Sequence, residues 1–467
     1  MSDRHEIHFG TDGWRALIGE GYTIDNLERV SLATADWIHE TYGSDRPVVI
    51  GHDSRFGGRR FAEHAARVLA STGLHVIVGE GITATPAVSW AVRDRNASAG
   101  IVITASHNPP EYNGFKIKGW FGGSALPDMI ADVEGRIRPF EDRHYPENPV
   151  LISREDLTEG YYGHVRTLID IDAIRKAGIR IVHDAMYGAG QGMFTALLGV
   201  DSVVEHRSTV NASFGGVAPE PIDRNLPELP RLVVEKGCAA GIANDGDADR
   251  IGMVDEQGRF VDSHRILALL VDYMSTDRGE TGTVVKTFST TDMLDKMGAA
   301  LGLTVETTPI GFKYIGDKIL QGDVLVGGEE SGGMAVKGHL PERDGIFIGM
   351  MILEMMARRG KSLGTLVDEL FEAYGPHAYY RIDAHTTPEN KERILKLLRD
   401  EGGLTEVNGH AVTSVADTDG FKHRTDAGWL LIRPSGTEPV LRVYAEAPSE
   451  QAAEAFVRDG LRQLTID

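Results

Sequence analysis

The chain repeats one pattern of apolar and polar positions three times. In each repeat, an apolar run rich in β-branched residues leads into a polar or glycine-rich turn, an amphipathic stretch of helical period and a second apolar run. The repeats cover residues 47–79, 179–206 and 283–315. This order predicts a βαβ unit on a largely parallel sheet. Its recurrence indicates three similar α/β domains in tandem.

The C-terminal region has a different pattern. Residues 377–387 are typical of a strand, residues 388–403 of a helix, residues 428–447 of two strands around a turn, and residues 449–464 of a final helix. Two helices with several strands predict a small α+β domain. The predicted class is therefore α/β, with three tandem similar domains that have mixed, largely parallel sheets, plus a C-terminal α+β domain. The four predicted domains cover residues 1–152, 153–257, 258–371 and 372–467.

Composition narrows the class of protein. The 467 residues are 41% hydrophobic and 25% charged, which is ordinary for a globular chain, and no apolar run is long enough to span a membrane. The start, MSDRHEIHFGTDGWR, has no apolar signal core, so the cytoplasm is expected. Cys238 is the single cysteine, which excludes an internal disulfide and a cysteine metal cluster. The net charge of −21 disfavours nucleic acid and anionic membranes but permits a small anionic substrate.

The first candidate functional segment is GIVITASHNPPEYNGFKIK, residues 100–118. A buried strand is expected to end there, because two consecutive prolines can continue neither a ladder nor a helix. Ligands of open α/β sheets bind at such strand ends, which would present Ser106 with His107 and Lys116 nearby. The G-x-S-x-G elbow of hydrolases is absent, and a serine that carries a phosphate needs cations. A polar loop with a turn serine is the alternative.

The second segment, GIANDGDADRIGMVD (residues 241–255), carries alternating carboxylates. Asp245, Asp247 and Asp249 can converge on one hard cation. An EF-hand is excluded because its sixth position requires glycine and is Arg250, and because both flanks are typical of strands. Mg²⁺ is therefore favoured over Ca²⁺, and a solvated acidic turn is the alternative.

The third segment, VLVGGEESGGMAVKG (residues 324–338), predicts a strand that runs into glycines. Glycines allow a ligand to approach the backbone closely. Glu329 and Ser331 could hydrogen-bond the vicinal hydroxyls of a sugar, with an ordinary hairpin turn as the alternative.

The fourth segment, LLIRPSGTEPVLRVYAEA (residues 430–447), concentrates hydrogen-bond donors in one turn. A guanidinium, two hydroxyls and exposed backbone N–H groups suit a phosphate. The donors are Arg433, Ser435, Gly436 and Thr437. The segment is not a P-loop, and a strand-connecting turn with a surface arginine is the alternative.

Other features of the sequence are weaker evidence for a functional site. Gly188, Gly190 and Gly192 follow a predicted strand, but the third glycine comes one place early for a dinucleotide fingerprint. The 17 histidines show no metal-ligand spacing. A methionine-rich run over residues 350–356 has helical spacing and indicates core packing rather than a cofactor site.

Together the four segments resemble the α-D-phosphohexomutase family along the whole chain. The most specific motifs are TASHNPPEYNGFK (104–116) and DGDADR (245–250), after which GEESGG and RPSGTEP follow in the family's order. The resemblance implies a heart-shaped arrangement of four domains around a central cleft. It also implies reversible phosphoryl transfer between O1 and O6 of a hexose phosphate, through a phosphoserine and a 1,6-bisphosphate intermediate.

The resemblance also assigns residues. Its catalytic positions correspond here to Ser106, Lys116, Arg15, His107 and Arg250. Its Mg²⁺ site corresponds to Asp245, Asp247, Asp249 and a phosphate oxygen on Ser106. Its substrate contacts correspond to Lys286, Gly311, Phe312, Glu329, Ser331, Arg433, Ser435, Gly436 and Thr437. Lys116 would be the general acid/base group, and we expect the neighbouring cations, Mg²⁺ and arginines, to lower its pKa.

The preferred sugar follows from finer details of the same resemblance. Family members that favour mannose often carry histidine after the glycine that is Gly311 here, whereas this chain has Phe312. The sequence GEES replaces the GEQS typical of glucosamine-phosphate mutases. We therefore expect glucose 1-phosphate and glucose 6-phosphate as substrates, mannose phosphates as poorer ones, and glucose 1,6-bisphosphate as activator.

Three alternatives stay open. One is a phosphoglucosamine mutase, another is a non-catalytic phosphosugar- or metal-binding protein on the same fold, and the third is a Mg²⁺-dependent phosphatase. The expected partners are small hexose phosphates, with no nucleic acid or membrane. Either a monomer or a homodimer is compatible with the sequence.

Overall fold

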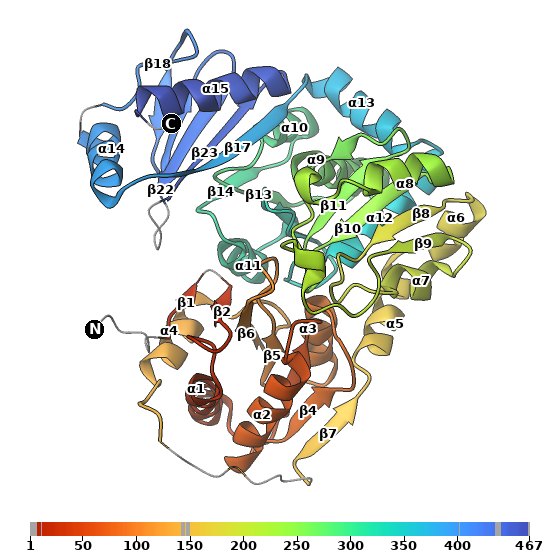
Figure 1. Cartoon of the computed structure of the whole chain (residues 1–467). Coiled ribbons are helices and arrows are strands. Elements are labelled where there is room, and N and C mark those ends of the chain that lie inside the picture. Colours follow the sequence, from red (N-terminus) through yellow and green to blue (C-terminus); the bar gives the residue numbers. More distant parts are fainter. Residues whose placement is uncertain are drawn as a thin grey trace. The chain divides into compact units, whose positions relative to one another are not determined.

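The computed structural model describes residues 7–10, 12–141, 145, 150–400, 402–434 and 440–465. These residues form two compact units, whose elements are labelled in Figure 1. The first unit comprises the chain up to Thr283 together with Gly311–Leu366, and the second comprises Val284–Ile310 together with the chain from Val367. No helix within the described ranges is long and apolar enough to cross a membrane.

A seven-stranded sheet organises the N-terminal part of the first unit, in the order β1-β2-β6-β5-β3-β4-β7. Its strands are β1 (Phe9–Gly10), β2 (Gly13–Leu17), β3 (Val48–His52), β4 (Val76–Gly79), β5 (Ala99–Ile103), β6 (Tyr112–Gly119) and β7 (Ile152–Glu155). The helices are α1 (Ile24–Tyr42), α2 (Gly58–Ser71), α3 (Thr85–Asp94) and α4 (Pro127–Gly135). β4 pairs in parallel with β3 and β7, whereas β6 is antiparallel to β5.

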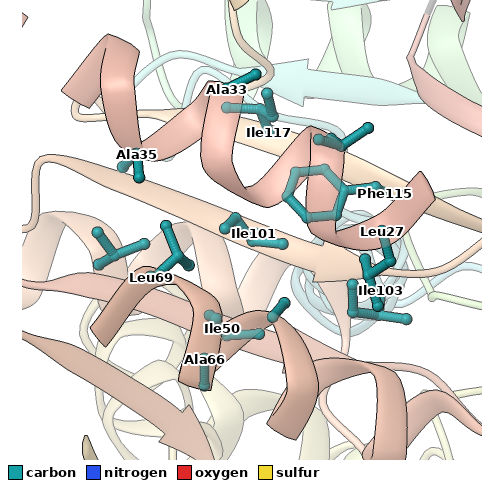
Figure 2. Close-up of a cluster of buried hydrophobic side chains, with 14 of the residues drawn as sticks. Leu27, Ala33, Ala35, Ile50, Ala66, Leu69, Ile101, Ile103, Phe115 and Ile117 are labelled. Carbon is teal, nitrogen blue, oxygen red and sulfur yellow. The ribbon is translucent and has the colours of Figure 1, made fainter. Parts of the chain in front are cut away.

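The core of this part follows from the two periodicities of its elements. Ile101 and Ile103 on β5, like Phe115 on β6, point to one face of the sheet and are buried there. Ala66 and Leu69, three residues apart on α2, cover that cluster, as Figure 2 shows. β5 is thus packed into the core up to the point where it ends and the chain enters the Ser106 loop.

The middle part of the first unit contains a five-stranded sheet in the order β12-β11-β10-β8-β9. Its strands are β8 (Ile181–Asp184), β9 (Val203–His206), β10 (Ala240–Asn244), β11 (Ile251–Asp255) and β12 (Phe260–Val261). The helices are α5 (Thr158–Leu168), α6 (Ile171–Lys176), α7 (Met193–Leu198), α8 (Leu229–Lys236) and the short 3-10 helices η1 (Phe214–Gly216) and η2 (Asp223–Asn225). β10 and β11 are antiparallel neighbours inside the sheet, so the acidic loop between them is a tight connection at the ends of these two strands.

The rest of the first unit surrounds a hairpin of β15 (Val324–Gly328) and β16 (Met334–Val336). Its helices are α9 (Ser263–Asp272), the π-helix η3 (Tyr273–Asp277), α11 (Phe312–Gln321) and α12 (Gly345–Arg359), while α13 (Leu363–Tyr374) leads into the second unit. The side chain of Asp344 caps α12 by accepting a hydrogen bond from the N–H of Phe347. The methionine-rich run lies on α12 and is buried, which confirms its packing role.

The second unit combines a parallel pair with an antiparallel sheet. β13 (Thr283–Thr287) and β14 (Val305–Thr308) run parallel on either side of α10 (Met293–Leu301). The five-stranded sheet has the order β17-β23-β22-β21-β20. The remaining elements are β17 (Ala378–His385), α14 (Pro388–Asp400), β18 (Glu406–Val407), β19 (His410–Ala411), β20 (Ser414–Ala416), β21 (Phe421–Arg424), β22 (Trp429–Pro434), β23 (Val440–Ala447) and α15 (Glu450–Gln463).

The secondary structure confirms the predicted pattern. Each of the three repeats is a strand, helix and parallel strand: β3-α2-β4, β8-α7-β9 and β13-α10-β14. The C-terminal region has the predicted strands and helices, with β20 and β21 added to the sheet. β7 completes the first sheet although it reaches past the boundary predicted near residue 152. The heart-shaped arrangement remains a prediction.

Candidate functional site

Ser106 lies in the loop that follows β5, and its backbone adopts an unusual conformation. Its φ is 52°, in the left-handed region that non-glycine residues occupy at a cost of about 1–3 kcal/mol. The side chain is buried; Oγ donates to Asp245 Oδ2 at 2.7 Å and lies 3.3 Å from His107 Nδ1. The Ser106 N–H donates to Thr104 Oγ1 at 2.8 Å. The loop therefore holds the hydroxyl against the acidic loop.

The acidic loop connects β10 to β11 and buries three carboxylates completely. Ligand oxygens of Asp245, Asp247 and Asp249 lie within 4.8 Å of one another. Burial and the charges of Asp247 and Asp249 raise the pKa of Asp245 well above its usual range. One oxygen each of Asp247 and Asp249 is buried without a hydrogen-bond partner. Converging hard donors with unused lone pairs fit a divalent cation such as Mg²⁺.

Lys116, on β6, faces the same loop. Its Nζ lies 2.7 Å from Asp247 Oδ2, 3.0 Å from Asp249 Oδ2 and 2.7 Å from Asp12 Oδ2. Burial alone would lower the pKa of Lys116, but these three carboxylates outweigh burial and raise it. Arg343 lowers the pKa of Lys116, as expected of a neighbouring cation, but the three carboxylates set the direction of the shift. The expected contribution of Mg²⁺ stays a prediction.

The other predicted catalytic residues lie around the Ser106 loop. Arg15 Nη1 donates to Asn108 Oδ1 at 2.7 Å. The Arg250 N–H donates to Asp245 Oδ1 at 3.1 Å, while the buried Nε of Arg250 has no hydrogen-bond partner. Burial, together with the positive charges of Arg250 and Arg15, lowers the pKa of His107 well below its usual range. His107 is therefore a neutral imidazole beside Ser106, and arginines supply the positive charge.

The predicted sugar-reading turn joins β15 to β16. Glu329 is buried, and burial, only partly offset by Arg343 and Arg250, raises its pKa to about 7. Arg343 Nη1 lies 3.7 Å from Glu329 Oε2. Ser331, on the same turn, is half-buried.

Gly311 and Phe312 begin α11 close to this turn. Gly311 has φ 131°, which favours glycine, and it caps the helix. The Phe312 ring is buried, and the Arg343 guanidinium carbon lies 5.5 Å from its centre. Phe312 therefore supports a cation of the site through its ring.

Two predicted substrate contacts are described in the second unit. Lys286, buried on β13, donates to the Thr291 carbonyl at 2.9 Å and pairs with Asp292 at 3.3 Å and with Asp295. Arg433, at the end of β22, donates through Nε to Asp419 Oδ1 at 2.8 Å. Ser435, Gly436 and Thr437 lie outside the described residues.

Sequence reasoning missed a second charged cluster, also in this unit. Asp292 pairs with Lys422 at 3.3 Å and with Arg424, in addition to Lys286. Lys422 Nζ lies 3.8 Å from the centre of the Trp429 ring. Burial, reinforced by Lys286 and Arg424, outweighs the attraction of Asp292 and lowers the pKa of Lys422 to about 8.

Other residues were missed in the first unit. Arg343, buried just before α12, pairs with Asp12 and lies 2.7 Å from Asp249. Thr85 Oγ1, at the start of α3, donates to Asp247 Oδ2 at 2.5 Å. Asp12 lies in the FGTDGWR motif and could have been proposed from it. Arg343 and Thr85 carry no local signal of their own, because their partners are far away in sequence.

Known proteins share this domain order. The chain matches phosphoglucomutase/phosphomannomutase alpha/beta/alpha domain I over residues 6–143, domain II over 159–258, domain III over 262–374 and the C-terminal domain over 391–462. A phosphoglucomutase/phosphomannomutase of Thermococcus kodakarensis is 33% identical over 98% of this chain and 98% of its own length.

Two further comparisons also cover nearly the full chain. A Thermococcus gammatolerans protein, provisionally named a phosphoglucosamine mutase, is 31% identical over 98% of this chain and 99% of its own. A crystal structure from Thermus thermophilus, provisionally assigned as a phosphomannomutase, has a TM-score of 0.88 at 33% identity and covers 99% of this chain and 100% of that one. With four matching domains in order, the chain belongs to the phosphoglucomutase/phosphomannomutase family, the α-D-phosphohexomutases.

Proposed function

We propose that the protein interconverts hexose 1-phosphates and hexose 6-phosphates, with glucose phosphates preferred and mannose phosphates as poorer substrates. The observation that carries this proposal is the position of Ser106, whose Oγ lies 2.7 Å from an aspartate of the acidic loop. The other two aspartates of that loop contact Lys116. A hydroxyl, a cation site and a buried ammonium group in one place suit phosphoryl transfer.

In this proposal Ser106 carries the phosphoryl group and donates it to the free hydroxyl of the bound sugar. Asp245, Asp247 and Asp249 would hold Mg²⁺, which supplies positive charge against the phosphoryl oxygens. Arg15 and Arg250 add charge stabilisation from the chain itself.

In this proposal Lys116 transfers the protons of the reaction. Its carboxylate neighbours keep it an ammonium, which can donate a proton to the serine oxygen as the phosphoryl group departs. The neutral amine then takes the proton of the sugar hydroxyl that accepts the phosphoryl group, and both proton transfers run in reverse when Ser106 is phosphorylated again. His107, neutral and beside Oγ, can accept a hydrogen bond and orient the hydroxyl.

Substrate recognition is assigned to two sets of residues. Glu329 and Ser331 would hydrogen-bond sugar hydroxyls, with Gly311 and Phe312 shaping the neighbouring turn. The non-transferring phosphate would bind the residues of the second unit: Lys286, Arg433, Ser435, Gly436 and Thr437. The 1,6-bisphosphate formed by the first transfer would turn around and return its other phosphoryl group to Ser106, so added glucose 1,6-bisphosphate acts as activator.

The proposal also assigns a role to each of the four predicted domains. It gives the phosphoserine to residues 1–152, the metal site to 153–257, sugar recognition to 258–371 and phosphate binding to 372–467. A cytoplasmic location and a monomer or homodimer remain predictions. A phosphoglucosamine mutase is the second candidate, because a relative provisionally named for that activity is 31% identical.

The test is a coupled assay of glucose 1-phosphate conversion to glucose 6-phosphate, with Mg²⁺ and catalytic glucose 1,6-bisphosphate. Mannose and glucosamine 1-phosphates are assayed in parallel, and Ser106→Ala is the control. Fastest turnover of glucose 1-phosphate, lost in the variant, is the expected result. Faster turnover of glucosamine 1-phosphate would favour the second candidate, and release of free phosphate would favour a phosphatase. No activity on any of the three would contradict the proposal.

A further inference from the structure

The guanidinium group of Arg55, in the turn after β3, donates four hydrogen bonds to one loop. Nη1 donates to the carbonyls of Pro109 at 2.8 Å and Tyr112 at 3.0 Å. Nη2 donates to the carbonyls of Ser106 at 2.7 Å and Asn108 at 2.6 Å. Three of the four acceptors belong to the segment between β5 and β6 that carries Ser106, and the fourth, Tyr112, is the first residue of β6.

This segment needs donors from outside itself. The segment forms a turn rather than part of a strand ladder, and its two prolines have no N–H group that could donate a hydrogen bond. Carbonyls left without partners inside a protein are costly. The Tyr112 N–H already donates to the Pro109 carbonyl at 3.1 Å, and the Arg55 guanidinium adds a donor there and also serves the carbonyls of Ser106, Asn108 and Tyr112. The left-handed conformation of Ser106 adds to the need, because such strain persists only where the surroundings enforce it.

The Arg55 guanidinium group is itself held by contacts at its Nε edge and on one of its flat faces. Its Nε lies 3.2 Å from Asp53 Oδ2, and its guanidinium carbon lies 4.9 Å from the centre of the Phe214 ring. The Arg55 side chain is completely buried. Asp53 also accepts a hydrogen bond from Thr104 Oγ1 at 2.5 Å, and that hydroxyl accepts one from the Ser106 N–H. Both the N–H and the carbonyl of Ser106 are therefore tied to the Asp53–Arg55 pair.

The acidic loop packs against the same carbonyl. A Cβ added to Gly246 would lie 2.4 Å from the Ser106 oxygen, so this position must be glycine for the two loops to approach. Movement of the Ser106 carbonyl would therefore also change the distance between Ser106 Oγ and Asp245. The geometry of phosphoryl transfer depends on that distance.

We propose that Arg55 is a positioning residue for phosphoryl transfer, which holds the Ser106 loop in the conformation that directs Oγ at Asp245. The inference rests on the proposed role of Ser106 as phosphoryl carrier. A lysine at position 55 keeps the charge but lacks the planar fork, so it cannot serve four carbonyls at once.

The experiment compares wild type, Arg55→Lys and the matched control Arg59→Lys, all with Mg²⁺ and starting from dephosphorylated enzyme. Arg59 is exposed on α2 and pairs only with Glu63 among the contacts described for it. The rate of Ser106 phosphorylation by glucose 1,6-bisphosphate is followed by peptide mass mapping, together with kcat and KM for glucose 1-phosphate. In Arg55→Lys, phosphorylation rate and kcat should fall about a hundredfold while KM stays within about twofold. Arg59→Lys should behave as wild type.

The outcomes separate the two proposals. Wild type that never gains a phosphoryl group on Ser106 would contradict the proposed function. Wild type and Arg55→Lys that react at equal rates would overturn the role of Arg55 alone. A rise in KM with kcat unchanged would also overturn it, because it would indicate substrate binding instead.

A second variant keeps the test decisive if Arg55→Lys does not fold. Asp53→Asn leaves the four carbonyl contacts in place but removes the charge that anchors Nε. Its phosphorylation rate should fall about tenfold at unchanged KM, as expected for the loss of one charge-assisted contact. An unchanged rate in a folded Asp53→Asn protein would overturn the proposal.

Discussion

Two buried lysines, one in each unit, have opposite electrostatic surroundings. Lys116 has three carboxylates within 3.0 Å of Nζ, whereas Lys422 shares the single carboxylate of Asp292 with Lys286 and Arg424. Burial disfavours the ammonium of both lysines. Even so, the pKa of Lys116 is raised, whereas that of Lys422 is lowered to about 8. The neighbouring charges therefore decide whether the effect of burial is overcome: three carboxylates overcome it at Lys116, whereas the shared carboxylate of Asp292 does not overcome it at Lys422.

This contrast predicts what each cluster attracts. Around Lys116, carboxylate oxygens of Asp247 and Asp249 remain without partners, which favours a cation. Around Asp292, the three basic side chains Lys286, Lys422 and Arg424 are accompanied by two further carboxylates, since Asp295 pairs with Lys286 and Glu446 acts on Lys422. The first cluster therefore has the charge preference that a metal site requires, whereas acidic side chains already accompany the basic ones of the second.

The largest expected effect is on the first cluster. The double variant Asp247→Asn/Asp249→Asn should lose Mg²⁺-dependent turnover by about a thousandfold or more, because the cation loses its charged ligands. Isothermal calorimetry with Mg²⁺ and the coupled assay measure binding and turnover. Asp292→Asn, in the second unit, is the control and should bind Mg²⁺ as wild type does. Mg²⁺ binding retained in the double variant would remove the acidic loop from the metal site.

The next effect concerns substrate phosphate in the second unit. Arg433→Ala should raise KM for glucose 1-phosphate about tenfold to a hundredfold, as expected when a charged hydrogen bond is lost. Phosphorylation of Ser106 by saturating bisphosphate should persist. Steady-state kinetics measures the effect, with Arg458→Ala, exposed on α15, as the control. An unchanged KM would show that Arg433 does not bind phosphate.

A smaller effect is a pH dependence in the first unit. Glu329 has its pKa raised to about 7, so it is protonated below that pH and accepts hydrogen bonds from sugar hydroxyls fully only above it. We expect kcat/KM to rise through pH 7 in wild type, since this parameter reports the free enzyme. Glu329→Gln should be about tenfold less active at pH 8 and should lack the rise. A variant that keeps the inflection would assign it to another group.

The smallest effect concerns stability in the second unit. The pKa of Lys422 is about 8 when folded and 10.5 when unconstrained, so between these values the unfolded chain binds more protons. The free energy of unfolding should therefore rise with pH between 8 and 10.5, where the penalty of a buried ammonium is relieved. Lys422→Met should lose that slope. Denaturant unfolding between pH 8 and 10.5 measures this slope in the wild type and the variant, and an NMR titration of the Lys422 side chain measures its pKa. A Lys422 signal that titrates near 10.5 would contradict the difference between the two lysines.

Local sequence predicted much of this molecule. The strands flanking the acidic loop, the end of β5 before Ser106 and all three βαβ units follow from short-range periodicity and from residues that cannot continue a strand. These features depend on neighbours within one element or turn. The convergence of Asp245, Asp247 and Asp249 was predictable for the same reason, since these aspartates are two residues apart.

Tertiary contacts could not be predicted in this way. Asp12 and Arg343 pair across most of the first unit, and Arg55 reaches a loop about fifty residues away. The carboxylates that raise the pKa of Lys116 could not be predicted locally, because they come from two distant segments, the turn with Asp12 and the acidic loop. No periodicity of the chain encodes such convergence.

The most direct test of the account follows the phosphoryl group itself. Enzyme that carries an unlabelled phosphoryl group is mixed with glucose 1-phosphate labelled with ³²P, and both protein and sugar are analysed after a single turnover. The account predicts that the label moves to the Ser106 peptide while the first glucose 6-phosphate formed is unlabelled. Label that stays on the sugar, with none on Ser106, would contradict transfer through the serine.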